Sequence, residues 1–136
     1  MISSGEPGVA APGRPCAAAT ARAVLLVEEK PICREALAQL LVRCGFDPPA
    51  VATGAADAGR ALDHGPLDHG RRLVVVDLFS VNYDFAWLRR FVAEADTCVV
   101  ALDDRSNPAL SALAREAGVR AYGSKDMEVA EIEAAI

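Results

Sequence analysis

Acidic residues directly follow several short apolar runs in this sequence, and a lysine follows the last of them. The residues concerned are Glu28, Glu29, Asp77, Asp103, Asp104 and Lys125. Carboxylates that crowd together repel one another unless a cation lies among them, and such hard oxygen ligands suit Mg²⁺. If the fold brings these residues together, they predict an acidic pocket whose charge is balanced by a divalent metal ion or by the lysine.

The elements that would have to position these side chains alternate between strand and helix. Short apolar runs predict five strands, at residues 23–27, 50–52, 73–76, 98–102 and 120–122. Apolar residues at helical spacing predict helices from Pro31 to the stop at Gly45, over 55–62, 84–95 and 108–117, and from Met127 onward.

This alternation of strands and helices predicts a doubly wound α/β fold with a five-stranded parallel sheet. In an open sheet of this kind, functional residues gather beyond the carboxyl ends of the strands. The acids and the lysine named above fall at those ends. Any one of them alone would more often be a solvated loop residue, so it is the set that predicts a site.

Length and composition fit one domain and exclude several classes of protein. The chain has 136 residues, of which 52% are hydrophobic, enough for one core. Residues 1–21 are rich in Gly, Pro, Ala and Ser, so we expect a disordered leader there and a folded domain over 22–136. The net charge of −5 offers no basic surface for DNA. No apolar run reaches the roughly 18 residues that cross a bilayer, so we expect a cytoplasmic protein without membrane contact.

Motifs for two common activities are absent from the sequence. No GxGxxG or GKS/GKT phosphate loop follows the first strand, which argues against dinucleotide and NTP binding. No GxSxG elbow surrounds Ser80 or Ser106, which argues against a serine hydrolase. We therefore expect neither of these activities.

Four segments together resemble the receiver domain of two-component response regulators. They are VEE after the first strand, VVVDL around Asp77, AL before Asp103, and AGVRAYGSK ending at Lys125. The resemblance extends from Ala23 to Ile136, and its C-terminal part is most similar to receivers that carry a LuxR-type helix-turn-helix output domain. It implies a flavodoxin-like (βα)5 fold with strand order 2-1-3-4-5. It also implies a protein that is not an enzyme and that contacts DNA only through an output domain outside this chain.

The resemblance implies a role for each pocket residue as well. Glu28, Glu29 and Asp77 would bind Mg²⁺, and Asp77 would accept a phosphoryl group from a histidine kinase. Lys125 would pair with the phosphoryl oxygens. Tyr122 matches an aromatic position whose rotation follows phosphorylation in typical receivers. A homodimer that regulates transcription through its output domain is the expected assembly.

The sequence departs from the receiver pattern where the phosphoryl group would be bound. Asp103 stands where the family has Thr or Ser, and its carboxylate would repel a phosphoryl group of about −2 charge. The rotation expected of Tyr122 would then no longer be coupled to phosphorylation. Glu29 is longer than the Asp usual at its position and should weaken the Mg²⁺ site. The segment 79–85 replaces the common Met-Pro and Asp-Gly pairs.

These departures leave three hypotheses. The first is an atypical receiver that regulates an attached or partner DNA-binding output by dimerisation or ligand binding, with phosphorylation at Asp77 weakened or lost. The second is a working phosphoacceptor in a two-component relay, since Asp77 and Lys125 are both present. The third is a small-molecule sensor whose ligand would lie beside Phe79, Asp103 and Tyr122.

Overall fold

The computed structural model describes residues 23–64, 73–95, 98–126, 130–131 and 134. The strands are β1 (Val24–Val27), β2 (Ala50–Ala52), β3 (Leu73–Asp77), β4 (Cys98–Asp103) and β5 (Ala121–Ser124). The helices are α1 (Pro31–Arg43), α2 (Ala55–His64), α3 (Phe85–Ala95) and α4 (Pro108–Glu116), with a short 3-10 helix, η2, at Phe79–Val81. Strands and helices alternate in the predicted order.

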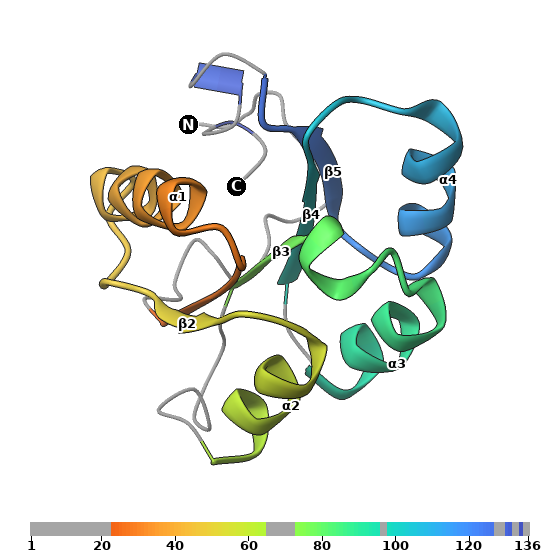
Figure 1. The fold of residues 1–136 in the computed structure, drawn as a ribbon, viewed down its shortest axis with the longest axis horizontal. Coiled ribbons are helices and arrows are strands. Elements are labelled where there is room, and N and C mark those ends of the chain that lie inside the picture. Colours follow the sequence, from red (N-terminus) through yellow and green to blue (C-terminus); the bar gives the residue numbers. More distant parts are fainter. Residues whose placement is uncertain (1–22, 65–72, 96–97, 127–129, 132–133, 135–136) are drawn as a thin grey trace, which may run out of the picture.

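The strands form a five-stranded parallel sheet in the order β2-β1-β3-β4-β5 (Figure 1). The first strand, β1, lies inside the sheet. The chain then forms β2 at one edge and crosses back over β1 to form β3, β4 and β5. This is the doubly wound, flavodoxin-like order, so the predicted fold class and strand order are confirmed. The direction of winding reverses between β1 and β3, which is where such sheets form their binding sites.

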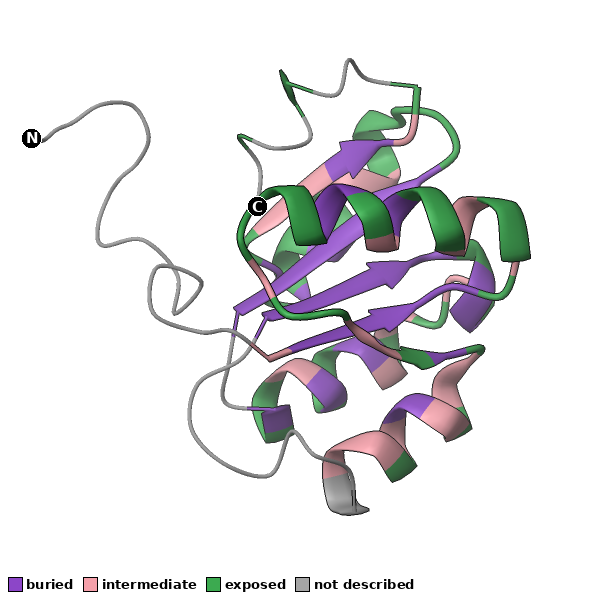
Figure 2. Ribbon diagram, turned by 90° about the vertical axis from the view of Figure 1, so that its left-hand side faces the viewer, coloured by how far each residue is buried: buried purple, intermediate pink, exposed green. Residues whose placement is uncertain are grey.

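Helices cover both faces of the sheet, and each face has its own apolar core (Figures 1 and 2). On one face α1 packs against the strands, and Leu41 shares a buried cluster with Leu26. On the other face α2, α3 and α4 pack together, and Leu88 shares a cluster with Val74. None of the helices in the described part of the chain is both long and apolar enough to cross a membrane.

The strands reach further toward the site than the apolar runs predict. β3 and β4 each extend one residue beyond the predicted run and so include Asp77 and Asp103. The predicted strand at 120–122 is observed as Ala121–Ser124, which ends directly before Lys125. Of the helix predicted from Met127, the structure describes residues 130, 131 and 134, which are helical. The predicted leader, residues 1–21, lies outside the described residues.

Backbone hydrogen bonds continue the sheet past the strand ends and fix the backbone at the site. The N–H of Glu28 donates to the carbonyl oxygen of Ala52 at 2.9 Å. The N–H of Lys125 donates to the carbonyl oxygen of Asp103 at 2.8 Å. The backbone of Glu28 and of Lys125 is therefore held by the sheet at its carboxyl edge.

Candidate functional site

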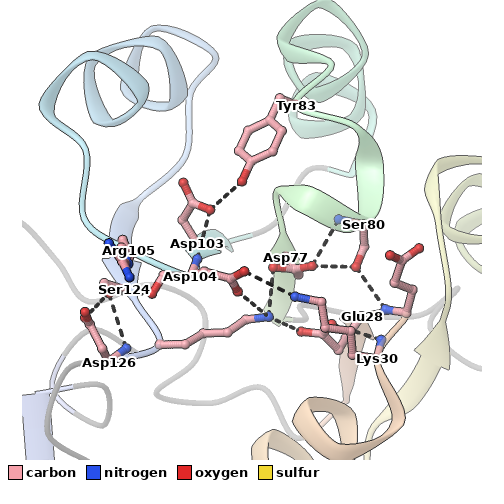
Figure 3. Close-up of polar contacts among 12 residues, drawn as sticks. Glu28, Lys30, Asp77, Ser80, Tyr83, Asp103, Asp104, Arg105, Ser124 and Asp126 are labelled. Carbon is pink, nitrogen blue, oxygen red and sulfur yellow. Dashed lines mark hydrogen bonds and ion pairs between the residues drawn. The ribbon is translucent and has the colours of Figure 1, made fainter.

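The ammonium group of Lys125 lies among three carboxylates at the carboxyl edge of the sheet (Figure 3). Its Nζ is 2.5 Å from Oε1 of Glu28, 2.9 Å from Oδ1 of Asp77 and 3.8 Å from Oδ1 of Asp104. Glu28 and Asp77 are buried, with 0% and 1% of their surface exposed. The structure thus brings these four residues into one cluster, which we call the Lys125 cluster.

Lys125 supplies the positive charge that two buried carboxylates require. An uncompensated charge in a protein interior costs several kcal/mol. Burial acts to lower the pKa of Lys125, but its contacts with Asp77 and Glu28 outweigh burial and hold that pKa well above the ordinary value. Lys125 is therefore protonated at neutral pH. The second oxygen of Glu28, Oε2, accepts the backbone N–H of Lys30 at 3.1 Å.

Ser80 holds the second oxygen of Asp77. The Ser80 hydroxyl donates to Oδ2 of Asp77 at 2.5 Å, and the Ser80 backbone N–H donates to the same oxygen at 3.0 Å. The hydroxyl in turn accepts the backbone N–H of Glu29 at 2.9 Å. Oδ1 of Asp77 faces Lys125 and accepts no hydrogen bond from another group among the described residues. One oxygen of Asp77 is thus fixed by the loop after β3, and the other is directed at the lysine.

The side chain of Asp103 is directed at two tyrosines rather than at Lys125. The Tyr83 hydroxyl donates to Oδ1 at 2.7 Å, and the Tyr122 hydroxyl donates to Oδ2 at 3.2 Å. The backbone N–H of Asp104 also donates to Oδ1, at 2.9 Å. The hydrogen bond to Asp103 is the main cause that raises the pKa of Tyr83 well above its ordinary value, whereas burial is the main cause that raises the pKa of Tyr122.

The loop that carries Tyr83 has an uncommon backbone conformation. After η2 the chain passes through Asn82 and Tyr83 with φ angles of 58° and 53°. Asn accepts this left-handed region readily, but a tyrosine rarely occupies it. The backbone N–H of Tyr83 donates to the carbonyl oxygen of Leu78 at 2.9 Å. Together with the hydroxyl bond to Asp103, this contact holds Tyr83 in place.

Lys30 links the loops after β1, β3 and β4. Its Nζ is 3.2 Å from Oδ2 of Asp104 and 4.8 Å from the centre of the Phe79 ring, which is within cation–π range. The side chains of Lys30 and Asp104 are 39% and 53% exposed, so solvent screens this ion pair and it adds little to stability. The contacts nevertheless place a second positive charge near the Lys125 cluster.

A divalent metal ion fits this arrangement poorly. Glu29, the second acid of the predicted metal site, is exposed. The ammonium of Lys125 already lies between the carboxylates of Glu28 and Asp77. Within the described ranges, no three acidic, histidine or cysteine side chains are placed to hold a metal ion. We therefore assign no chemical step to a metal.

Three contact-forming residues at this site have no role predicted from the sequence, namely Lys30, Ser80 and Tyr83. Ser80 and Tyr83 lie within 79–85, the segment that departs from the receiver pattern, and that departure is the signal that could have found them. Lys30 simply follows two acids and offers no such signal. Its role appears only when the loop after β4 is placed beside it.

Solved structures of response regulators and receiver domains are similar to this one. A response regulator from Thermotoga maritima has a TM-score of 0.70 and 24% identity, over 83% of this chain and 92% of that chain. The beryllofluoride-activated NtrC4 receiver domain dimer has a TM-score of 0.66 and 16% identity, over 81% and 88%. The receiver domain of sensor histidine kinase PA1611 from Pseudomonas aeruginosa PAO1, with a magnesium ion in its active site cleft, has a TM-score of 0.64 and 18% identity, over 83% and 92%.

No family model and no curated protein matches the sequence of this chain. At these low identities, the structural likeness establishes the fold. The chain therefore has the fold of receiver domains. What its site does depends on the contacts described above.

Proposed function

We propose that this chain is an atypical response-regulator receiver domain in which phosphorylation of Asp77 is weakened or lost. The observation that carries the proposal is the buried carboxylate of Asp103, 3% exposed, at the position where receivers have Thr or Ser. The domain regulates an attached or partner DNA-binding output of LuxR type, by dimerisation or ligand binding. It is a cytoplasmic signalling module and not an enzyme.

Asp103 opposes the phosphorylated state through its charge. A phosphoryl group on Asp77 would carry about −2 charge at neutral pH. A Thr or Ser hydroxyl at the end of β4 would donate a hydrogen bond to that group, whereas a carboxylate can only repel it. Asp103 also cannot turn toward the group without giving up the hydrogen bonds from Tyr83 and Tyr122.

Ser80 supports the same conclusion from the acceptor's side. Its hydroxyl and N–H both donate to Oδ2 of Asp77, at 2.5 Å and 3.0 Å. Hydrogen bonds to an ionised carboxylate are strong and stabilise its negative charge. An oxygen held in this way is a weaker nucleophile toward a phosphoryl donor.

A working phosphoacceptor is the second candidate, and one observation favours it. Oδ1 of Asp77 lies 2.9 Å from Nζ of Lys125 and accepts no other hydrogen bond among the described residues. This is the arrangement expected if Oδ1 of Asp77 attacks a phosphoryl donor and Lys125 neutralises the added negative charge. In that case a histidine kinase would supply the phosphoryl group, with Mg²⁺ as cofactor. The small-molecule hypothesis gains no comparable support, because both oxygens of Asp103 already have partners in Tyr83 and Tyr122.

Incubation with acetyl phosphate and Mg²⁺, followed by intact-mass measurement, tests the proposal. The Asp77→Asn variant is the matched control, because it removes the acceptor and keeps its size. We expect little phosphoryl adduct on the wild type. A nearly complete single adduct on the wild type that is absent from Asp77→Asn would overturn the proposal and favour the working relay.

A further inference from the structure

The chain has two tyrosines, and both donate a hydrogen bond to one carboxylate, that of Asp103. The hydroxyl of Tyr83 is 2.7 Å from Oδ1, and the hydroxyl of Tyr122 is 3.2 Å from Oδ2. Asp103 is 3% exposed, so the carboxylate depends on these donors for its stability. We call these three residues the tyrosine bridge.

Hydrogen bonds continue from Tyr122 to the start of α4. Its hydroxyl accepts the backbone N–H of Asn107 at 3.2 Å, and the carbonyl oxygen of Arg105 lies 3.4 Å from it. Asn107 is the N-cap of α4, and its side chain accepts the N–H of Ala109 at 2.9 Å. Tyr122 thereby attaches the end of the loop between β4 and α4 to β5.

Tyr83 connects the tyrosine bridge to the loop after β3, which also contacts the Lys125 cluster through Ser80. Tyr83 comes shortly after Ser80, whose hydroxyl binds Asp77. Figure 3 shows the ring of Tyr83 directed from this loop toward Asp103. The backbone of Tyr83 has a φ of 53°, so this side chain is presented by an unusual turn and not by a regular element. A continuous series of contacts thus runs from the loop after β3 to the first turn of α4.

We infer that Tyr83 and Asp103 are positioning residues that hold Tyr122 and the β4–α4 loop in one arrangement with no group bound to Asp77. If Tyr122 moved away, a buried carboxylate would lose a donor, which makes that movement unfavourable. The start of α4 is therefore set by side chains of the chain itself. The inference does not depend on whether Asp77 can be phosphorylated, so it fails or holds separately from the proposed function.

Amide hydrogen exchange, measured residue by residue by NMR, tests this role in Tyr83→Phe. The variant removes one donor from Asp103, and the loosening should reach the N–H of Asn107 beyond Tyr122. We expect exchange at Asn107 to become roughly tenfold faster, the factor for a lost hydrogen bond to a charged group. The matched control is Asn82→Gly, which changes the same loop, keeps its left-handed conformation accessible and leaves the hydroxyl in place. There the exchange at Asn107 should keep its wild-type rate.

Faster exchange confined to residues 79–84 in Tyr83→Phe, with Asn107 unchanged, would overturn the inference. Amides of β1 and β3 serve as the internal reference for intact folding.

A second measurement does not require that variant to fold. In Tyr122→Phe the remaining tyrosine is Tyr83, and its ionisation can be followed by tyrosinate absorbance. We expect ionisation well above the ordinary pH for tyrosine, and a return toward that pH when Asp103→Asn is added. Ionisation of Tyr83 at its ordinary pH in folded Tyr122→Phe would show that the bridge does not form, and the inference would fail.

Discussion

Lys125 has 13% of its side chain exposed and contacts two carboxylates that are almost completely buried. Its removal would leave Glu28 and Asp77 close together without a cation. Breaking a buried ion pair by deleting one partner costs about 3–5 kcal/mol, much more than losing an exposed pair. At the scale of single residues, the stability of the pocket therefore depends on this lysine.

We predict that Lys125→Met lowers the free energy of unfolding by about 3 kcal/mol. Urea denaturation followed by the fluorescence of Trp87, the single tryptophan, measures the change. Adding Glu28→Gln should restore much of the loss, because it removes one of the two uncompensated charges. Lys30→Met is the matched control and should cost far less than Lys125→Met, since its partner Asp104 is exposed and solvent screens the pair. Equal losses in the two lysine variants would contradict this view of the pocket.

Alkaline pH should weaken the folded state through Tyr83 and Lys125. The hydrogen bond to Asp103 raises the pKa of Tyr83. Burial acts to lower the pKa of Lys125, but the contacts with Asp77 and Glu28 outweigh it and raise that pKa. A raised folded-state pKa contributes its full stability below the unfolded-state pKa and loses it as the pH rises toward the folded-state value. The unfolding free energy should therefore stay level up to about pH 10 and fall above it. Urea denaturation between about pH 8 and 12 checks this, and a level curve throughout would contradict it.

At the scale of elements, the central strands could be predicted because helices cover both faces of the sheet. β1 and β3 are buried along their length, so each reads as an unbroken apolar run. The ends of these runs correctly place Glu28 and Asp77 at one edge of the sheet. The direction of the Asp103 side chain could not be predicted in this way. It depends on the left-handed turn that presents Tyr83, and no periodicity in the sequence encodes that turn.

Gly118, between α4 and β5, should not tolerate a side chain. Its φ is +103°, and a Cβ atom there would lie 3.1 Å from Cγ1 of Val92 on α3. We predict that Gly118→Ala lowers the free energy of unfolding by about 2 kcal/mol.

Gly59 in α2 is the matched control, because a Cβ atom there would meet nothing within 4 Å. Gly59→Ala should raise the free energy of unfolding by up to about 1 kcal/mol, since Ala favours helix. Urea denaturation of both variants measures the contrast. Effects of the same sign would contradict the role assigned to Gly118.

At the scale of the whole molecule, a receiver fold is combined with a pocket whose positive charge comes from its own lysines. Lys125 lies between Glu28 and Asp77, and Lys30 is bound to Asp104. The fold could be predicted because its elements follow from hydrophobic pattern. The balance of charge in the pocket could not be predicted, because it depends on which loops lie side by side at the carboxyl edge of the sheet.

We predict that millimolar Mg²⁺ leaves the melting temperature nearly unchanged compared with a sodium salt of equal ionic strength. A ligand that binds only the folded state stabilises it by RT ln(1 + [L]/Kd), which is negligible when the site is weak. Differential scanning calorimetry measures the shift. A clear rise that EDTA reverses would mean that the pocket does hold the metal.

In the proposed function, Asp103 impairs phosphorylation of Asp77. The most direct test compares how fast Asp103→Thr and the wild type form a phosphoryl adduct with acetyl phosphate and Mg²⁺. Both proteins keep Asp77 and Lys125, so the comparison isolates the residue at the end of β4. We predict that Asp103→Thr reacts at least roughly tenfold faster, which corresponds to about 1.4 kcal/mol of relieved repulsion. Equal rates in the two proteins would show that Asp103 does not impair phosphorylation.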